Sequence, residues 1–143
     1  MKTTTHTLLI AYLLALVLFL LLDACWLMLM GPRLYAPALG PLMAPSVDWA
    51  AALLFYVLYI VGLVALAVQP ALAGGSPGIA LRRGALLGLV AYATYDLTNQ
   101  ATLQGWPWRV TLADLAWGTF VTGVSAWAAA RLTSPPESRT GAR

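Results

Sequence analysis

The sequence predicts an all-α membrane protein of four antiparallel transmembrane helices with both termini in the cytoplasm. Three observations support this fold class. Hydrophobic residues make up 61% of the 143 residues, charged residues only 9%, and the mean hydropathy is +0.80, far from the balance of a soluble domain. Four apolar segments are each long enough to cross a bilayer. The basic residues lie mainly on one side of these segments.

The four predicted spans cover residues 8–30, 49–68, 79–103 and 111–131. The connections between them contain strong turn signals: "GPRLYAPALGPLMAPS", "QPALAGGSPG" and "QGWPW". Residues 1–132 are therefore expected to form one transmembrane domain. The polar, proline-containing segment 133–143 is expected to be a disordered cytoplasmic tail.

The first span is expected to be retained rather than cleaved. Lys2 and the apolar stretch that ends in "LDAC" approach the signal of a lipid-modified protein. However, Asp23 stands where that signal has a small uncharged residue, and "WLMLM" continues the apolar run. Cys25, the only cysteine, is interpreted as a small helix residue.

The basic residues predict the orientation of the spans. With four spans, both termini share one side of the membrane, and this side holds Lys2, Arg82, Arg83, Arg131, Arg139 and Arg143. The opposite side holds only Arg33 and Arg109. Because cytoplasmic loops carry the excess of Lys and Arg, both termini are predicted to be cytoplasmic.

The aspartates gather in the outer half of the predicted bundle. Asp23 and Asp96 lie far along the first and third spans, and Asp48 and Asp114 begin the second and fourth spans from the outside. Asp48 is most simply a helix N-cap. Thr111 with Asp114 fits a capping box, so Asp114 is either structural or part of a site.

The third span must contain polar residues. Its apolar part, residues 79–93, is too short to cross roughly 30 Å of hydrocarbon, so the span has to include "TYDLTNQATL". Exposure of Asp96 and Asn99 to lipid would cost several kcal/mol, which predicts that they face protein or water. Helical spacing places Tyr92, Asp96 and Asn99 on one face, with Tyr95 adjacent.

The first and fourth spans share the pattern Asp-x-x-Trp, in Asp23 and Trp26 and in Asp114 and Trp117. Three residues apart on a helix, the indole is expected to shield the carboxylate of its own helix or to donate to it through the N–H group.

Small residues recur at helical spacing in the third and fourth spans. Gly84 and Gly88 lie in "GALLG", and Gly118, Val121 and Ser125 form a second stripe. Such stripes favour close packing of membrane helices.

The strings "YDLTNQATLQGWPWRVTLADLAWG", "LDACWL" and "LFYVLYIVGLVALAVQPAL" resemble the bacterial membrane family known as domain of unknown function 2177. The resemblance covers nearly the whole chain up to about Arg131. It implies four spans and a multi-pass location in the bacterial inner membrane. It implies no reaction, and cofactor use stays unknown. The residues on the recurring motifs of the family are Asp23, Trp26, Tyr95, Asp96, Asn99, Asp114, Trp117 and Gly118.

Several kinds of chemistry are excluded. The single histidine, His6, lies at the cytoplasmic end, which excludes a Ser-His-Asp site or a zinc site beside the outer acids. The basic residues are scattered, so no nucleic-acid partner is predicted. Asp23 and Asp96 are the catalytic candidates, because two close carboxylates can share a proton or, with Asn99, hold a hard cation. No metal site is assigned on spacing alone.

Three functions are weighed for this outward-facing polar site. The favoured one is binding or modification of a membrane lipid or another amphipathic molecule. The alternatives are a small proton-coupled carrier, which would require a homo-oligomer, and a structural subunit whose polar residues only specify packing. The expected binding residues are Trp26, Tyr92, Tyr95, Asn99, Asp114, Trp117, Arg33 and Arg109.

The outer surface supplies further expectations. Arg33 and Arg109 would either pair with the carboxylates or contact a phosphate headgroup. The sticky outer loop, residues 31–47, would lie on the membrane or cover the acidic site as a lid. An aromatic belt at the membrane interface is expected from Tyr35, Trp49, Trp106 and Trp108.

Overall fold

The computed structural model describes residues 4–134, which form helices and contain no strand. The first helical segment comprises α1 (Thr5–Met30), η1 (Gly31–Tyr35), α2 (Ala36–Leu39) and η2 (Gly40–Leu42). The second comprises α3 (Trp49–Leu63), η3 (Val64–Val68) and α4 (Gln69–Ala73). The last two are α5 (Pro77–Thr102) and α6 (Trp108–Thr133). The predicted all-α class is thus confirmed, and each predicted span is helical.

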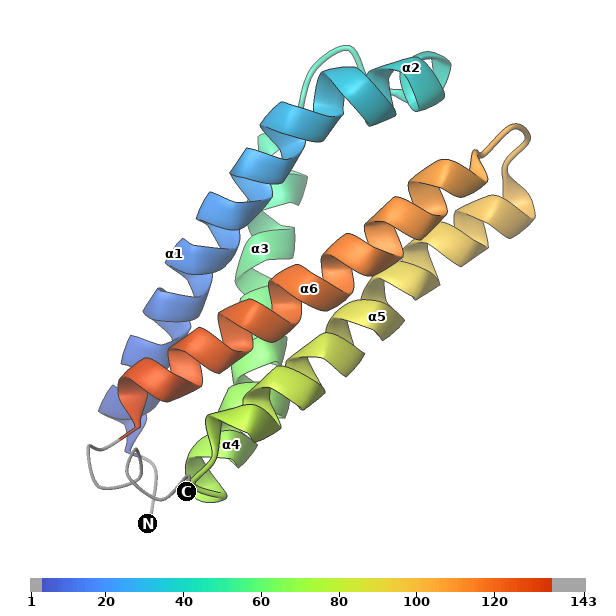
Figure 1. Cartoon of the computed structure of the whole chain (residues 1–143). Coiled ribbons are helices and arrows are strands. Elements are labelled where there is room, and N and C mark those ends of the chain that lie inside the picture. The colour runs from blue at the N-terminus through green and yellow to red at the C-terminus, as the bar shows by residue number, and fades with distance from the viewer. Residues whose placement is uncertain (1–3, 135–143) are drawn as a thin grey trace.

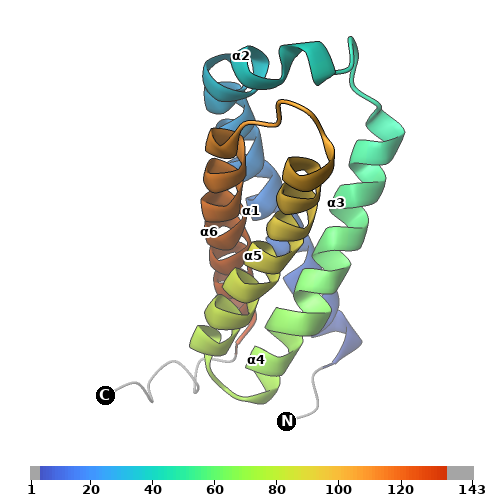
Figure 2. The same ribbon diagram turned by 90° about the vertical axis from the view of Figure 1, so that its right-hand side faces the viewer.

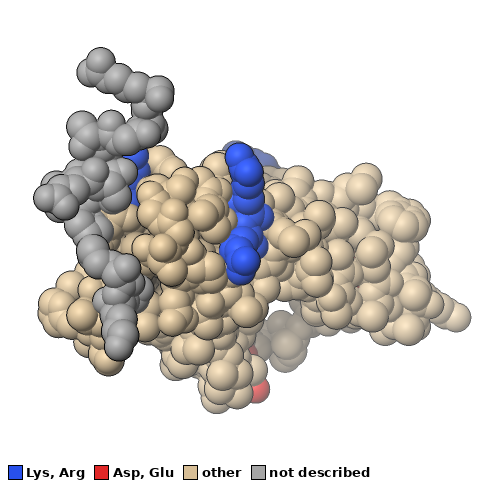
Figure 3. Space-filling model, turned by 90° about the horizontal axis from the view of Figure 1, so that it is seen from below, with Lys and Arg blue, Asp and Glu red and all other residues tan. Residues whose placement is uncertain are grey.

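The helices form an elongated bundle with two distinct ends (Figure 1). One end carries α2 and the turn between α5 and α6, and is called the α2 end. The other carries α4, the start of α1 and the last turn of α6, and is called the α4 end. Arg82, Arg83 and Arg131 are exposed close to the α4 end, and basic side chains stand out when the molecule is seen from that side (Figure 3).

Two helix starts test the predicted caps. The side chain of Asp48 caps α3, since its Oδ1 accepts a hydrogen bond of 3.1 Å from the backbone N–H of Ala51. That prediction is confirmed. The predicted capping box is wrong, because α6 begins three residues before Thr111 with Pro107 as its N-cap. Thr111 and Asp114 lie inside the helix, where their side chains are free to bond to other elements.

The end of α6 also extends past its predicted limit. Thr133 is helical, and the Ser134 hydroxyl donates to the Ala130 carbonyl at 2.7 Å. The rest of the predicted tail, residues 135–143, lies outside the described residues, as do Lys2, Arg139 and Arg143.

The predicted outer loop is helical from Gly31 to Leu42, which corrects the expectation of a loop there. Pro32, Pro37 and Pro41 each stand at the first or second position of a short helical turn. Because Thr5–Leu42 is one continuous helical segment, each proline removes a backbone donor from inside it. Each proline therefore bends the segment without unwinding it.

Pro70 has the same effect between η3 and α4. It has no N–H to donate to the Leu66 carbonyl four residues earlier. Arg83 of α5 supplies the missing donor, with its Nη1 at 3.2 Å from that oxygen. The wide π turn η3 immediately precedes this point, as expected where a proline ring crowds the preceding turn.

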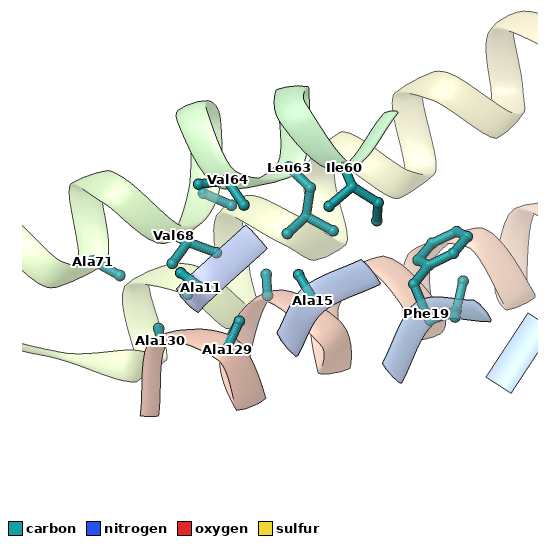
Figure 4. Packing of buried hydrophobic residues seen from close by; sticks show 14 residues of the cluster. Ala11, Ala15, Phe19, Ile60, Leu63, Val64, Val68, Ala71, Ala129 and Ala130 are labelled. Carbon is teal, nitrogen blue, oxygen red and sulfur yellow. The ribbon is translucent and has the colours of Figure 1, made fainter. Parts of the chain in front are cut away.

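The apolar core lies toward the α4 end (Figure 4). Small residues of α1 and α6 pack there against larger side chains of α3 and η3, including Ile60 and Leu63. The buried residues of α1 are four apart: Ala11, Ala15, Phe19 and Asp23. Asp23 therefore continues the same buried stripe toward the α2 end, where the core becomes polar.

Helices α5 and α6 lie side by side because glycines let their backbones meet (Figures 1 and 2). A Cβ atom on Gly88 would stand 2.0 Å from the Gly118 carbonyl oxygen, and one on Gly84 would stand 2.8 Å from the Ala126 side chain. A Cβ on Gly118 would collide with the Tyr92 ring at 2.2 Å. The predicted close approach is confirmed, and it holds Tyr92 flat against α6.

Two segments are long and apolar enough to cross a membrane, Thr5–Leu42 and Trp49–Ala73. Helices α5 and α6 are more polar and do not meet the same test within residues 4–134. Their polar residues are concentrated toward the α2 end, where α6 turns Thr111 and Asp114 inward. A crossing by these two helices stays a prediction.

Candidate binding site between the helices

Asp23 joins three helices through hydrogen bonds. Its side chain is buried, and its Oδ2 accepts a bond of 2.6 Å from the Tyr56 hydroxyl of α3. Its Oδ1 accepts a bond of 3.2 Å from the indole Nε1 of Trp117 on α6. A carboxylate with a donor for each oxygen is far less costly to bury than an unpaired one, so α1, α3 and α6 meet at Asp23.

Asp114 of α6, like Asp23, accepts a hydrogen bond from a tyrosine hydroxyl. Its Oδ1 accepts a short hydrogen bond from the Tyr35 hydroxyl of η1. The indole Nε1 of Trp26 donates to that same hydroxyl at 2.7 Å. Tyr35 therefore links α1 to Asp114, which is also buried.

The two Asp-x-x-Trp patterns are crossed between the helices. Trp117 donates to the aspartate of α1, whereas Trp26 reaches the aspartate of α6 through Tyr35. The two indoles stack with ring centroids 4.5 Å apart and planes 7° from parallel. We call Asp23, Trp26, Tyr35, Tyr56, Asp114 and Trp117 the crossed network. The expectation that each indole serves its own helix is wrong, because packing places each one beside the facing helix.

Asp96 of α5 has a different environment. Its side chain is fully buried at 0% exposure, and neither Oδ1 nor Oδ2 has a hydrogen-bond partner within residues 4–134. Asp114 lies within electrostatic range of it. No hydrogen bond joins Asp96 to Asp23 in the described chain, so the predicted proton-sharing pair is not formed in this conformation. Burial of a carboxyl group without a donor costs stability.

An apolar groove of about 470 Å³ lies between α3 and α5. Phe55 and Tyr59 line it from α3, and Ala91, Tyr92 and Tyr95 line it from α5. The two helices diverge toward the α2 end (Figure 1). The groove therefore has aromatic walls on both sides.

Tyr92 connects the groove to the acidic residues. Its ring packs on Gly118, and its phenol lies within electrostatic range of both Asp23 and Asp114. Tyr59 on the opposite wall is hydrogen-bonded to the Thr122 hydroxyl of α6 at 2.8 Å. The groove wall formed by Tyr92 thus lies within electrostatic range of both aspartates of the crossed network.

The sequence model of one family matches residues 8–131, and its description is "Predicted membrane protein (DUF2177)". The chain belongs to DUF2177. The resemblance predicted from the motifs is confirmed. No curated protein and no solved structure matches the chain. Membership of DUF2177 establishes a membrane protein and leaves its activity to be argued from the site.

Three other predicted site residues of this DUF2177 member, Asn99, Arg33 and Arg109, lie outside the crossed network. Asn99 is half-buried one turn beyond Asp96, beside Tyr95. Arg33 and Arg109 are exposed and form no ion pair within residues 4–134, so they do not neutralise the acids. The described residues also contain no group of three His, Cys, Asp or Glu side chains that could hold a metal ion.

The expected aromatic belt is only partly present. Trp49 and Trp108 are 70% and 58% exposed, as a belt requires. Trp106 is buried, and its Nε1 donates to the Thr111 hydroxyl at 3.1 Å. Gln100 completes a ring of hydrogen bonds at the α5–α6 turn by donating to the Trp106 carbonyl and accepting from Thr111. Trp106 therefore stabilises a turn, which corrects its assignment to the belt.

Sequence reasoning missed the tyrosines of the site. Tyr35 was expected in the belt, and Tyr56 and Tyr59 were not singled out because the second span contains no charged residue. A signal was available, since Tyr56 and Tyr59 lie seven and four residues before Leu63, on the face that packs into the core. A tyrosine on a buried face needs a partner for its hydroxyl.

Proposed function

We propose that this DUF2177 protein binds a membrane lipid or another amphipathic molecule in the groove between α3 and α5. The observation that carries the proposal is a groove with aromatic walls, one of which, Tyr92, is adjacent to the buried carboxylates. Such a site suits an amphipathic molecule, whose apolar part would lie along the groove and whose polar part would lie toward the carboxylates. Binding is favoured over chemical modification, because the catalytic pair of Asp23 and Asp96 is not joined in the described chain.

The proposed setting is the bacterial inner membrane, with four antiparallel spans and both termini in the cytoplasm. Helices α5 and α6 have 26 residues each, about 39 Å at 1.5 Å per residue, which exceeds the roughly 30 Å hydrocarbon layer. Their aspartates Asp96 and Asp114 are buried inside the bundle, so neither is exposed to lipid in a crossing. With the basic α4 end in the cytoplasm, the groove and the acids belong to the outer half.

A fusion experiment tests this orientation. A reporter that is active only outside the cytoplasm, placed after Arg143, is expected to be silent. The same reporter inserted between Pro45 and Val47 is expected to be active. The reverse pattern would contradict the orientation without affecting the groove.

Native mass spectrometry tests the binding itself. The purified protein is expected to retain lipid, and Ala91→Trp is expected to abolish this because the indole fills the groove. Ala101→Trp is a matched control, since Ala101 is an exposed alanine of the same helix that does not line the groove. Equal retention by both variants, or no retention by the parent, would refute the proposal.

A proton-coupled carrier is the second candidate, and the unpartnered carboxyl group of Asp96 is the observation that favours it. Ionisable groups inside membrane helices often carry protons in transporters. In liposomes with a pH-sensitive dye inside, substrate-driven proton movement would be lost in Asp96→Asn. Four helices would need a second copy of the chain to form a pathway, so a strictly monomeric protein would argue against a carrier.

A further inference from the structure

We infer that the groove between α3 and α5 selects amphipathic molecules whose polar group is a cation, such as a hydrophobic amine or quaternary ammonium compound. This inference rests on the proposed binding function and adds a ligand class to it. Three features of the described chain support it: the charges beside the groove, the positions of the arginines, and the chemistry of the walls.

The ionisable groups beside the groove are acidic, and no basic side chain of residues 4–134 pairs with them. Asp23 and Asp114 lie within electrostatic range of Tyr92, which lines the groove, and Asp96 lies within range of Asp114. Only neutral donors serve the first two carboxylates, namely tyrosine hydroxyls and an indole N–H. Within residues 4–134, no ion pair involves any of the three acids. A cation in the groove would supply the positive charge that the protein does not.

The described arginines lie elsewhere. Arg83 donates to the Leu66 carbonyl, and Arg131 stands 5.8 Å from the ring centre of Trp127. Arg33, Arg82 and Arg109 are exposed near the helix ends, and none of the arginines lines the groove. An anionic group such as a phosphate would therefore find no cation inside the groove.

The walls also favour a positive charge. Phe55, Tyr59, Tyr92 and Tyr95 present four aromatic rings to a groove that spans two helices. The faces of such rings carry negative potential and attract cations, above all weakly hydrated ones. An anion would be repelled both by these faces and by the carboxylates behind Tyr92. The low dielectric of a membrane interior strengthens both effects.

Tyr92 sets the depth of the proposed site. Tyr92 lines the groove within electrostatic range of Asp23 and Asp114, no acid among residues 4–134 lines the groove, and Asp96 itself is fully buried. The cation therefore rests against aromatic rings and experiences the carboxylates through space. Direct contact with a carboxylate is not required for the selectivity.

Two probes of the same shape and opposite charge test the inference: tetraphenylphosphonium and tetraphenylborate. Binding is measured by equilibrium dialysis with the full chain in an uncharged detergent, against micelles without protein. Tetraphenylphosphonium is expected to bind at least tenfold more tightly, and Ala91→Trp is expected to abolish its binding. Equal or tighter binding of tetraphenylborate, or no binding of either probe, would overturn the inference.

Asp96→Asn separates the role of charge from that of shape. The variant loses no hydrogen bond of the described chain, so it is expected to fold, to bind tetraphenylphosphonium several-fold more weakly and to leave tetraphenylborate binding unchanged or tighter. Asp48→Asn is the matched control, because it removes the same charge at the exposed start of α3. Identical tetraphenylphosphonium binding by parent and Asp96→Asn would overturn the contribution of this carboxylate.

The failure of this inference can be told apart from the failure of the proposed function. Lipid retention that depends on Ala91, without preference for the cationic probe, would leave the groove as a binding site and refute only its charge selectivity. If lipid retention does not depend on Ala91 and the cationic probe is not preferred, the groove is refuted as a binding site.

Discussion

The crossed network and the Asp96 site both bury carboxyl groups toward the α2 end, yet only the crossed network provides donors for them. Tyr56 and Trp117 serve the two oxygens of Asp23, whereas both oxygens of Asp96 have no partner within residues 4–134. A satisfied buried polar group stabilises packing, and an unsatisfied one costs stability. Residues that cost stability are common at functional sites, so we interpret the Asp23 hydrogen bonds as stabilising the packing and Asp96 as the stronger functional candidate.

The largest expected effect comes from Gly88→Ala, which disrupts the contact between α6 and α5, the helix that carries Asp96. The added Cβ would stand 2.0 Å from the Gly118 carbonyl oxygen, so α5 and α6 would have to separate. We expect a loss of up to about 3 kcal/mol in the free energy of unfolding. Gly62→Ala is the control, because its Cβ would have no atom within 4 Å. Similar melting temperatures of the two variants in detergent would show that the close approach is not present.

Asp23→Asn and Asp96→Asn test the comparison directly. In Asp23→Asn the amide oxygen can still accept from Trp117 and the amide NH₂ can donate to the Tyr56 hydroxyl, so two charge-assisted hydrogen bonds become neutral ones at a cost of about 1 kcal/mol. Asp96→Asn loses no hydrogen bond and is expected to leave the melting temperature unchanged or higher. Thermal unfolding in detergent measures both. Equal destabilisation would mean that Asp96 also belongs to a packing network.

Trp117→Phe sharpens the description of the crossed network. Phenylalanine keeps an aromatic ring for the stack with Trp26 but has no N–H for Asp23. We expect a loss of about 1 kcal/mol in unfolding free energy. In a double-mutant cycle with Asp23→Ala, the two losses should be less than additive, because both variants remove the same contact. Strict additivity would show that the indole does not donate to Asp23.

Ser125→Ala has the smallest expected effect. It tests, at an uncharged residue, whether a buried polar group without a hydrogen-bond partner costs stability. The Ser125 hydroxyl is buried and has no partner within residues 4–134. Its removal is expected to change the melting temperature little or to raise it. A clear decrease would reveal an unseen partner, and would weaken the same interpretation of Asp96.

Much of the local structure follows from short-range patterns. The four helical segments and the Asp48 cap were predictable because each depends on residues within a few turns of one helix. The close approach at Gly88 was predictable from the small-residue stripe on each of the two helices. The segment after Met30 was harder, since prolines read as loop signals in sequence. In the structure they lie inside the helical segment that continues α1, which passes them through π and 3₁₀ turns.

The sequence by itself determined that this is a helical membrane protein of the DUF2177 family whose aspartates must avoid lipid. Only the tertiary structure decided which side chains meet those aspartates. The exchange of partners between Trp26 and Trp117 depends on how α1 and α6 pack against each other, and the groove at Tyr92 depends on how far α3 diverges from α5. Helix periodicity specifies which face a residue occupies, but the neighbour on that face is set by contacts between segments distant in the chain.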